Sequence, residues 1–126
     1  MEPKSFGKKE LPEQVVRRKL VELMERRKWY VHITHGNAYS HGLPDLYCGH
    51  VNHGLRWIEC KNADSYHFTS AQLREFPKMM AVGIGIWVVA LPVGFSEAAL
   101  EYEYENVIIK GPPNWTKYLG HSKRPY

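Results

Sequence analysis

Hydrophobic residues recur at helical spacing in residues 12–28, which follow a polar N-terminal arm. Val16, Leu20 and Leu23 lie three and four positions apart within "PEQVVRRKLVELMERRK", and Pro12 and Glu13 stand where a helix would begin. The positions between the apolar residues are mostly basic. This pattern predicts a helix with one core-facing side and a basic opposite side.

Shorter apolar runs follow, with the period and composition of strands. Residues 29–35 ("WYVHITH") are β-branched and aromatic, and residues 43–51 and 55–61 form two further runs. Turn-forming residues separate the first run from the second, and the tight turn at 52–54 separates the second from the third. The last two runs are therefore expected to pair as a hairpin.

A second helix and a further strand complete the main pattern. Thr69 and Gln72 have the spacing of a capping box at the start of "TSAQLREFPKMMAVG", and Pro77 should kink or shorten the helix. Residues 84–92 ("IGIWVVALP") form a continuous apolar run, which predicts a central strand covered on both faces. The order α-β-β-β-α-β predicts an α/β fold with a mixed central sheet flanked by helices.

The pattern is weaker beyond Pro92. Residues 95–109 ("FSEAALEYEYENVII") predict one short helix and an edge strand, and residues 111–126 are basic and aromatic without an acidic residue. Such a tail suits stacking on bases and contact with phosphates, or packing as an arm on its own domain or on a second subunit. The expected organisation is a polar arm (1–10), one folded domain (11–109) and this tail (110–126).

Composition narrows the class of protein. The 126 residues are 44% hydrophobic and 24% charged, as in globular domains, and the net charge of +4 suits a polyanionic partner without requiring one. Cys48 and Cys60 are expected to be free buried thiols in a reducing cytoplasm. The N-terminus lacks the apolar core of a signal peptide, and the longest apolar run (residues 81–95) is too short and too rich in glycine to span a bilayer. We therefore expect a cytoplasmic protein without a membrane partner.

Three charged residues interrupt the predicted hairpin. Because side chains alternate along a strand, Glu59 and Lys61 project on the same face as Trp57, and the hairpin would bring Asp45 near Lys61 at its open end. Charges in a half-buried strand are costly unless they are paired or bind a metal, and two carboxylates suit magnesium. A lysine beside them suits phosphodiester hydrolysis. The alternative is an Asp at a turn and a Glu–Lys pair on a solvated sheet face.

The order of these motifs resembles a known superfamily. "PD" followed by a hairpin and "ECK" is similar to the PD-(D/E)xK nucleases. More narrowly, "GLPDLYCG", "RWIECK" and "FTSAQLREFPKMMAVGIGIWVV" resemble the VRR-NUC family, the virus-type replication-repair nucleases, over about residues 11–91. The resemblance implies a restriction-endonuclease-like core and a Mg²⁺- or Mn²⁺-dependent endonuclease that acts on DNA in repair or recombination.

The resemblance also implies roles for particular residues. Lys61 would be the catalytic lysine and Gln72 would lie beside it, while the metal ligands would be Asp45, Glu59, Glu13 and the backbone carbonyl of Cys60. Two of these residues have a simpler explanation, since Gln72 suits a capping box and Glu13 suits the positive end of a helix dipole. The loop "HGNAYSHGL" departs from the family pattern, because histidines stand where relatives offer arginine for phosphate contact.

The expected partner is DNA, whose phosphates basic side chains would contact. No nucleotide cofactor is expected. Candidate phosphate contacts are Arg17, Arg18, Lys117, Lys123 and Arg124. Stand-alone members of the family resemble Holliday-junction-resolving homodimers, which implies branched DNA and a bacterial cell or phage-infected host. A less selective nickase or flap nuclease would carry the same motif.

Three rival hypotheses stay open. An HNH-type nuclease would use the clustered histidines, and a zinc site would use cysteines together with histidines. A non-catalytic nucleic-acid-binding module on the same fold would need no metal for affinity. The residues concerned are His32, His35, Asn37, His41, His50 and His53 for the first rival, and Cys48, His50, His53 and Cys60 for the second.

Overall fold

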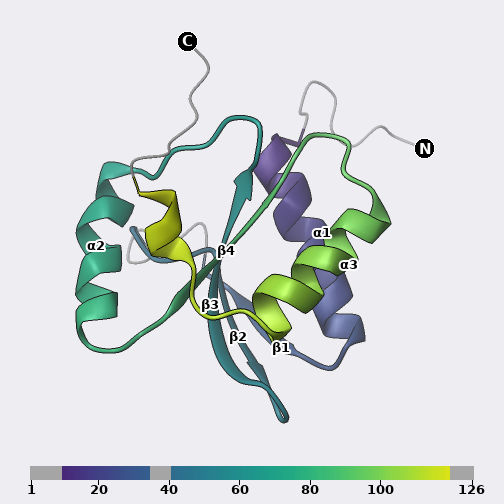
Figure 1. The fold of residues 1–126 in the computed structure, drawn as a ribbon, viewed down its shortest axis with the longest axis horizontal. Helices are drawn as coiled ribbons and strands as arrows, with labels where there is room; N and C mark the ends of the chain where they lie inside the picture. The colour runs from purple at the N-terminus through teal and green to yellow at the C-terminus, as the bar shows by residue number, and fades with distance from the viewer. Residues whose placement is uncertain (1–9, 35–40, 120–126) are drawn as a thin grey trace.

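A four-stranded mixed sheet forms the middle layer of the protein in a computed structural model that describes residues 10–34 and 41–119 (Figure 1). The strands lie in the order β1-β2-β3-β4, with β1, β2 and β3 antiparallel and β4 parallel to β3. Their bounds are Tyr30–Ile33 for β1, Leu46–His50 for β2, Gly54–Asn62 for β3 and Ile86–Leu91 for β4. A parallel pair needs a crossover connection, and a helix supplies it between β3 and β4.

One face of the sheet packs against the first helix and the C-terminal helical segment. Helix α1 (Pro12–Arg26) lies beside α3 (Glu97–Glu103) and the π-helical turn η2 (Tyr104–Ile109), as Figure 1 shows. The apolar positions of α1 that recur at helical spacing, among them Leu20 and Leu23, are buried against this face of the sheet. The largest hydrophobic core of the described residues lies in this layer.

The opposite face carries a smaller, aromatic core. Helix α2 (Ser70–Ala81) and the 3-10 helix η3 (Trp115–Tyr118) cover this side. Phe68, Phe76 and Trp115 pack edge to face, with ring centroids 5.2 to 6.2 Å apart. Such edge-to-face packing contributes beyond the buried area alone. The apolar tail residue Trp115 is therefore part of the domain core, and Lys123 and Arg124 lie outside the described residues.

The predicted order α-β-β-β-α-β is confirmed for the first six elements. Residues 84–92 were predicted to form a central strand covered on both faces. The strand they form, β4, is covered on both faces, but the prediction of a central position was wrong because β4 lies at an edge of the sheet. Helix α2 is not shortened at Pro77 and continues to Ala81. The mixed sheet flanked by helices is thus an α/β arrangement.

The hairpin pairs in a different register from the one expected. A turn at 52–54 would have placed Asp45 opposite Lys61, whereas the turn occupies 51–53 and the strands pair with Leu46 opposite Ile58. Gly54 is the first residue of β3 and has a φ of +82°, which glycine adopts without steric cost. The shift is two residues, so every side chain keeps its predicted face.

The prediction of an edge strand after Pro92 was wrong. Leu100, Tyr104 and Ile108 are buried at a spacing of four, and the chain stays helical from Glu97 to Ile109. Isoleucine and valine at the end of this segment favour a strand by propensity. The packing of a helical face against the sheet overrides that preference.

At the edge of β4 that faces no other strand, one asparagine forms hydrogen bonds with the backbone. The side chain of Asn114 accepts a hydrogen bond from the Val88 N–H (2.6 Å) and donates one to the Val88 carbonyl (3.1 Å). Its own backbone N–H donates to the Ile86 carbonyl. Asn114 therefore takes the place of a neighbouring strand over this part of the edge.

The structure also bears on the predicted state of the cysteines and on the predicted absence of a membrane span. Cys48 and Cys60 are free and buried, as predicted. Within the described ranges, no helix has the length and apolar character needed to cross a membrane.

Replacing Asn114 with alanine removes both side-chain hydrogen bonds to the buried Val88 backbone. We expect the free energy of unfolding, measured by urea denaturation, to fall by about 1 to 3 kcal/mol. Asn106→Ala is the matched control, because the exposed Asn106 side chain donates one hydrogen bond to the Tyr102 carbonyl. That variant should change stability by less than about 0.5 kcal/mol. Equal losses in the two variants would contradict the role of Asn114 as an edge partner.

Candidate functional site

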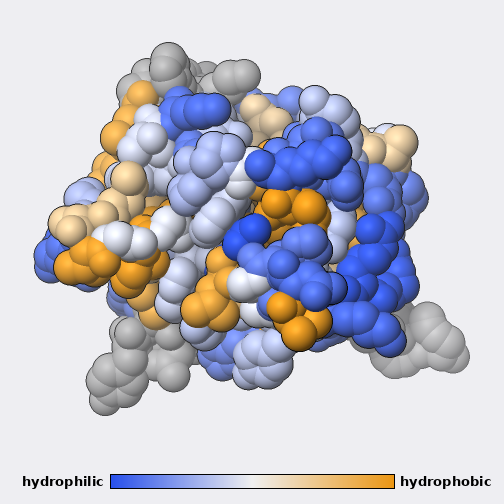
Figure 2. Space-filling model, turned by 60° about the horizontal axis from the view of Figure 1, so that its bottom comes forward, coloured by the Kyte–Doolittle hydropathy of each residue, from blue (hydrophilic) through white to orange (hydrophobic). Residues whose placement is uncertain are grey.

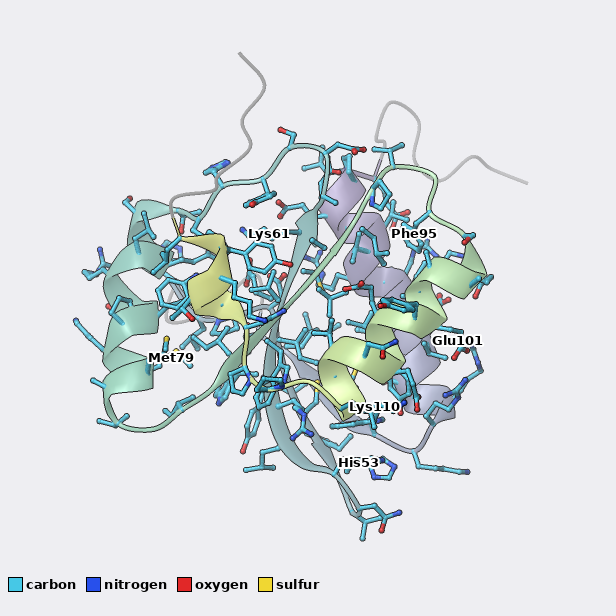
Figure 3. All side chains as sticks on the ribbon, viewed as in Figure 1. His53, Lys61, Met79, Phe95, Glu101 and Lys110 are labelled. Atoms are coloured by element: carbon cyan, nitrogen blue, oxygen red, sulfur yellow. The ribbon has the colours of Figure 1, made fainter. Side chains whose placement is uncertain are left out.

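Glu59 and Lys61 lie on β3 and face the layer of α2. They alternate with Ile58 and Cys60, which face α1 and belong to the larger core. Glu59 is 2% exposed and Lys61 3% exposed, so both charged groups are inside the protein. Figure 3 shows Lys61 toward the end of the sheet away from His53, which lies at the hairpin turn. The alternative of a solvated Glu–Lys pair does not describe these residues.

A closed set of polar contacts satisfies this buried pair. The Lys61 Nζ lies 3.0 Å from Glu59 Oε2, and the Gln72 Nε2 donates to the same oxygen at 2.8 Å. Lys61 Nζ also donates to Gln72 Oε1 at 3.4 Å. The ammonium lies 4.7 Å from the centre of the Phe68 ring, which adds a cation–π contact. Each charge thus has a partner that offsets part of its desolvation cost.

Gln72 caps α2 and also lies beside Glu59 and Lys61, the two positions that the sequence suggested for it. Its backbone N–H donates to Thr69 Oγ1 at 3.1 Å, and its Oε1 accepts the Thr69 N–H at 3.0 Å, which is the predicted capping box. The same amide contacts Glu59 and Lys61. The start of α2 is therefore tied directly to the charged pair on β3.

Asp45 lies opposite Glu59, just before the first residue of β2. Its backbone N–H donates to Glu59 Oε1 at 3.1 Å, and its Oδ2 accepts the Cys60 N–H at 3.0 Å. Oδ1 lies 3.9 Å from the Arg17 guanidinium of α1. Asp45 and Glu59 therefore meet as predicted, although the register places Asp45 across from Glu59 and not Lys61.

Hydrogen bonds from Thr34 and the close packing of Gly42 fix the backbone that leads into Asp45. Thr34 N–H donates to the Asp45 carbonyl at 2.9 Å, and the Thr34 hydroxyl donates to the Pro44 carbonyl. Gly42 has a φ of +84°, and a Cβ there would lie 2.7 Å from Glu75 Cγ and 2.8 Å from the Ala71 carbonyl. Only glycine allows this close approach to α2.

Burial governs the electrostatics of the site. Desolvation, followed by repulsion from Asp45, raises the pKa of Glu59 from 4.5 to about 8, although Lys61 and Gln72 act in the opposite direction. Burial also raises the pKa of the Cys60 thiol well above its ordinary value and that of Cys48 to about 12. A thiol that stays protonated is a poor nucleophile.

Two carboxylates, and not a larger group, meet at this place. Glu13 lies in the first turn of α1, and within 10–34 and 41–119 no group of three or more His, Cys, Asp and Glu residues is arranged to hold a metal ion. Glu13 therefore does not join Asp45 and Glu59 in such a group. The same finding gives the zinc hypothesis no support among the described residues, and Cys60 lies further along β3 than Gly54, which pairs with His50.

The clustered histidines do not gather at one place: His50 and His53 pack at the hairpin, while His32 on β1 and His41 are exposed. His53 stacks on Trp29 with ring centroids 5.9 Å apart, and the tilted ring of His50 packs against the same indole at 5.1 Å. The Nε2 of His50 lies 3.1 Å from the Arg27 carbonyl oxygen. His35 and Asn37 lie outside the described residues. The two hairpin histidines thus support the α1 side of the sheet.

Of the basic residues predicted to contact phosphates, Arg17 and Arg18 pair with carboxylates, whereas Lys117 is exposed. Arg17 contacts Asp45, and Arg18 makes a two-pronged contact with Glu10 at 2.7 and 2.9 Å. Both arginines line a pocket of about 280 Å³ between α1 and β1, together with Val21 and Ile33. Lys117 is exposed on η3.

Sequence reasoning missed two members of the site. The contact of Arg17 with Asp45 had no sequence signal beyond its basic character, and Phe68 had only its position directly before the Thr69 cap. Arg17 is brought to Asp45 by the packing of α1 against the sheet, and Phe68 is brought to Lys61 by the fold of the loop between β3 and α2.

Comparison with other proteins adds nothing to this geometry. No family model matches the chain, and no significant match exists among curated proteins or solved structures.

The raised pKa of Glu59 predicts a pH dependence of stability in the absence of metal. Between about 4.5 and about 8 the folded state binds the Glu59 proton that the unfolded state has lost, so the free energy of unfolding falls as pH rises. The slope from this one group is at most about 1.4 kcal/mol per pH unit. Urea denaturation in EDTA at pH 5 to 8 should show the stability of Glu59→Gln improving relative to the unmodified protein as pH rises. Glu25→Gln, on the exposed side of α1, should show no such trend, and a parallel response of both variants would contradict the assignment.

A second prediction separates the two roles of Gln72. Thr69→Ala removes one side of the cap and should cost about 1 kcal/mol of unfolding free energy. Gln72→Ala removes the cap and also leaves Glu59 and Lys61 without their shared amide, so its cost should be larger by about 1 to 3 kcal/mol. Thermal or urea unfolding measures both, and equal losses would mean that the amide contributes only to the cap.

Proposed function

We propose that the protein is a metal-dependent endonuclease that hydrolyses DNA phosphodiester bonds. The observation that carries the proposal is the convergence of Asp45, Glu59 and Lys61 at one place, with Glu59 and Lys61 buried side by side. A buried lysine next to two carboxylates is expensive to maintain for stability alone, since an apolar pair of similar volume serves as well. Perturbed ionisable groups of this kind are typical of functional sites.

The residues present fit a divalent cation. Asp45 and Glu59 are close enough for the Asp45 charge to raise the pKa of Glu59, and a cation would relieve that repulsion. In an extended strand the N–H and C=O of a residue point to the same edge, so the Cys60 carbonyl shares the edge at which Cys60 N–H meets Asp45. Oxygen donors of these three kinds suit Mg²⁺ or Mn²⁺. Glu13 would contribute only through a rearrangement at the start of α1.

Each side chain of the site would have a separate role in hydrolysis. Bound at Asp45 and Glu59, the metal would polarise the phosphate and lower the pKa of a bound water. Lys61, held by Glu59, Gln72 and the Phe68 ring, would orient the attacking water and stabilise negative charge on the phosphate. Gln72 would position Lys61, and Asp45 is itself positioned by Cys60 N–H.

The family assignment belongs to the same proposal. The confirmed order α-β-β-β-α-β and the placement of "PD" and "ECK" on either side of one hairpin support a PD-(D/E)xK core of the VRR-NUC kind. We extend the proposal to branched DNA cut by a homodimer, because a symmetric junction needs two symmetric cuts and a two-fold dimer presents two sites. Arg17, Arg18 and Lys117 would contact phosphates, as would Lys123 and Arg124 in the tail.

One observation favours a second candidate, a nucleic-acid-binding module without catalysis. Glu59 Oε2 is engaged by both Lys61 and Gln72, and Oε1 by the Asp45 N–H, so the carboxylate is internally satisfied without any cation. A module of this kind would bind DNA equally well with or without metal.

Cleavage of a labelled four-way junction, a matched duplex and a flap tests the proposal, in Mg²⁺, Mn²⁺ or EDTA. We expect metal-dependent cuts that fall by about 100-fold or more in Asp45→Asn and Lys61→Met. Asp45→Asn keeps an acceptor for the Cys60 N–H, and Lys61→Met keeps volume while removing the charge. The exposed Lys110→Ala serves as the control and should cut normally.

The pattern of products separates the parts of the proposal. Paired symmetric cuts in the junction alone support the dimeric resolvase, whereas equal cutting of all three substrates retains the nuclease and removes junction selectivity. Binding without cutting in any metal would establish the binding module in its place.

A further inference from the structure

The face of the sheet on the α2 side is covered at one end and open at the other. α2 and η3 pack near β4, where Ile86 and Val88 are buried. The hairpin end of the same face carries a group of five side chains that are at least partly exposed. Tyr30 is 67% and Leu55 63% exposed, His32 is exposed, and Tyr47 and Trp57 are half-buried. In Figure 1 the hairpin of β2 and β3 extends past the end of α2.

The strand register arranges these side chains in rows that lead to the carboxylates. One row contains Tyr30, Gly49 and Leu55, the next contains His32, Tyr47 and Trp57, and the row after it contains Asp45 and Glu59. Consecutive rows are two residues apart along each strand, which is about 7 Å. The aromatic rows therefore continue directly from the proposed catalytic residues on one sheet face.

Four of the five side chains in these two rows are rings, Tyr30 in the first row and His32, Tyr47 and Trp57 in the second. The rings of Tyr47 and Trp57 lie 4.6 Å apart with planes inclined by 33°. No acidic side chain stands in either row, and Gly49 places no side chain between Tyr30 and Leu55. Nucleic-acid bases stack on such surfaces whatever their sequence, and the net charge of +4 attracts their phosphates.

We propose that these residues, the aromatic face, bind the bases of unpaired nucleotides adjacent to the scissile phosphate. The location of that phosphate rests on the proposed nuclease function. Bases inside a duplex are already stacked on one another, so a stacking surface selects single-stranded segments. The substrate class is therefore DNA with an unpaired stretch beside the cut, which a flap offers directly and a four-way junction offers only where base pairs at its centre open.

A second copy of the chain is the competing occupant of this face. Permanent interfaces have a continuous apolar core. Figure 2, which brings the hairpin end forward, shows hydrophobic residues in several separate small patches among hydrophilic ones. His32 and the two tyrosines also give the aromatic face a polar content that suits bases.

Binding of single-stranded probes in EDTA at fixed salt tests the inference without requiring catalysis. The probes are a fluorescent oligothymidylate of about 12 nucleotides and an abasic strand of the same length, which keeps the phosphates and lacks the bases. We expect the unmodified protein to bind the oligothymidylate about 5- to 100-fold more tightly than the abasic strand. Tyr30→Ala and Trp57→Leu should each lose most of that preference, and Trp57→Phe should retain it.

Tyr102→Ala is the matched control. Tyr102 lies on α3 in the other helical layer and is 64% exposed, close to the exposure of Tyr30. This variant should keep the full preference for bases. Circular dichroism and the urea midpoint verify that every variant is folded, and the exposed Tyr30 provides a reading that does not depend on the half-buried Trp57.

Three results would overturn the inference. They are equal binding of the two probes by the unmodified protein, an intact preference in both Tyr30→Ala and Trp57→Leu, and a change in sedimentation mass in place of a change in preference. Loss of the nuclease proposal is visible separately, since it would appear as base-preferring binding without metal-dependent cleavage. Cleavage without base preference would leave the nuclease and remove the aromatic face.

Discussion

The burial of Glu59 and Lys61 beside each other is the constraint on which the site and one helical layer depend. Charges removed from water need partners at short range, and β3 alone cannot supply them. Gln72 and Phe68 provide them from the first turn of α2 and the chain just before it, and the Asp45 N–H provides one from the chain just before β2. The first turn of α2 must therefore lie over this part of β3. The cap formed by Thr69 fixes the same turn from within the helix.

The end of one strand ladder makes the site possible. β2 begins at Leu46, so β3 continues past it and the Cys60 N–H has no strand partner on that edge. Asp45 accepts that N–H and meets Glu59 there. A longer β2 would bury this edge in ordinary strand pairing. The carboxylates thus converge where regular pairing stops, which is also where backbone groups remain available to a ligand.

Much of this arrangement follows from local pattern. Alternation along β3 predicted that Glu59 and Lys61 share a face, and the spacing of Thr69 and Gln72 predicted the cap. Local pattern could not place Asp45 opposite Glu59, because the register depended on which three residues form the hairpin turn. It also missed the contact of Arg17 with Asp45.

The remaining differences come from tertiary packing. Isoleucine and valine at 107–109 favour a strand in isolation, and their helical path depends on burial of Leu100, Tyr104 and Ile108 against the sheet. The edge position of β4 was hidden for a similar reason. Its apolar run reads as a central strand because Asn114 and η3 cover what a neighbouring strand would otherwise cover.

The two edges of the sheet are consequently unequal. Asn114 occupies backbone groups of β4, whereas β1 pairs only with β2 in the part of the chain that the structure describes. An edge strand normally presents a row of unpaired N–H and C=O groups on which another chain can template, and sheets blunt such edges in several ways. On β4 the amide of Asn114 does this within the chain itself, because it occupies the Val88 N–H and C=O that a foreign strand would need.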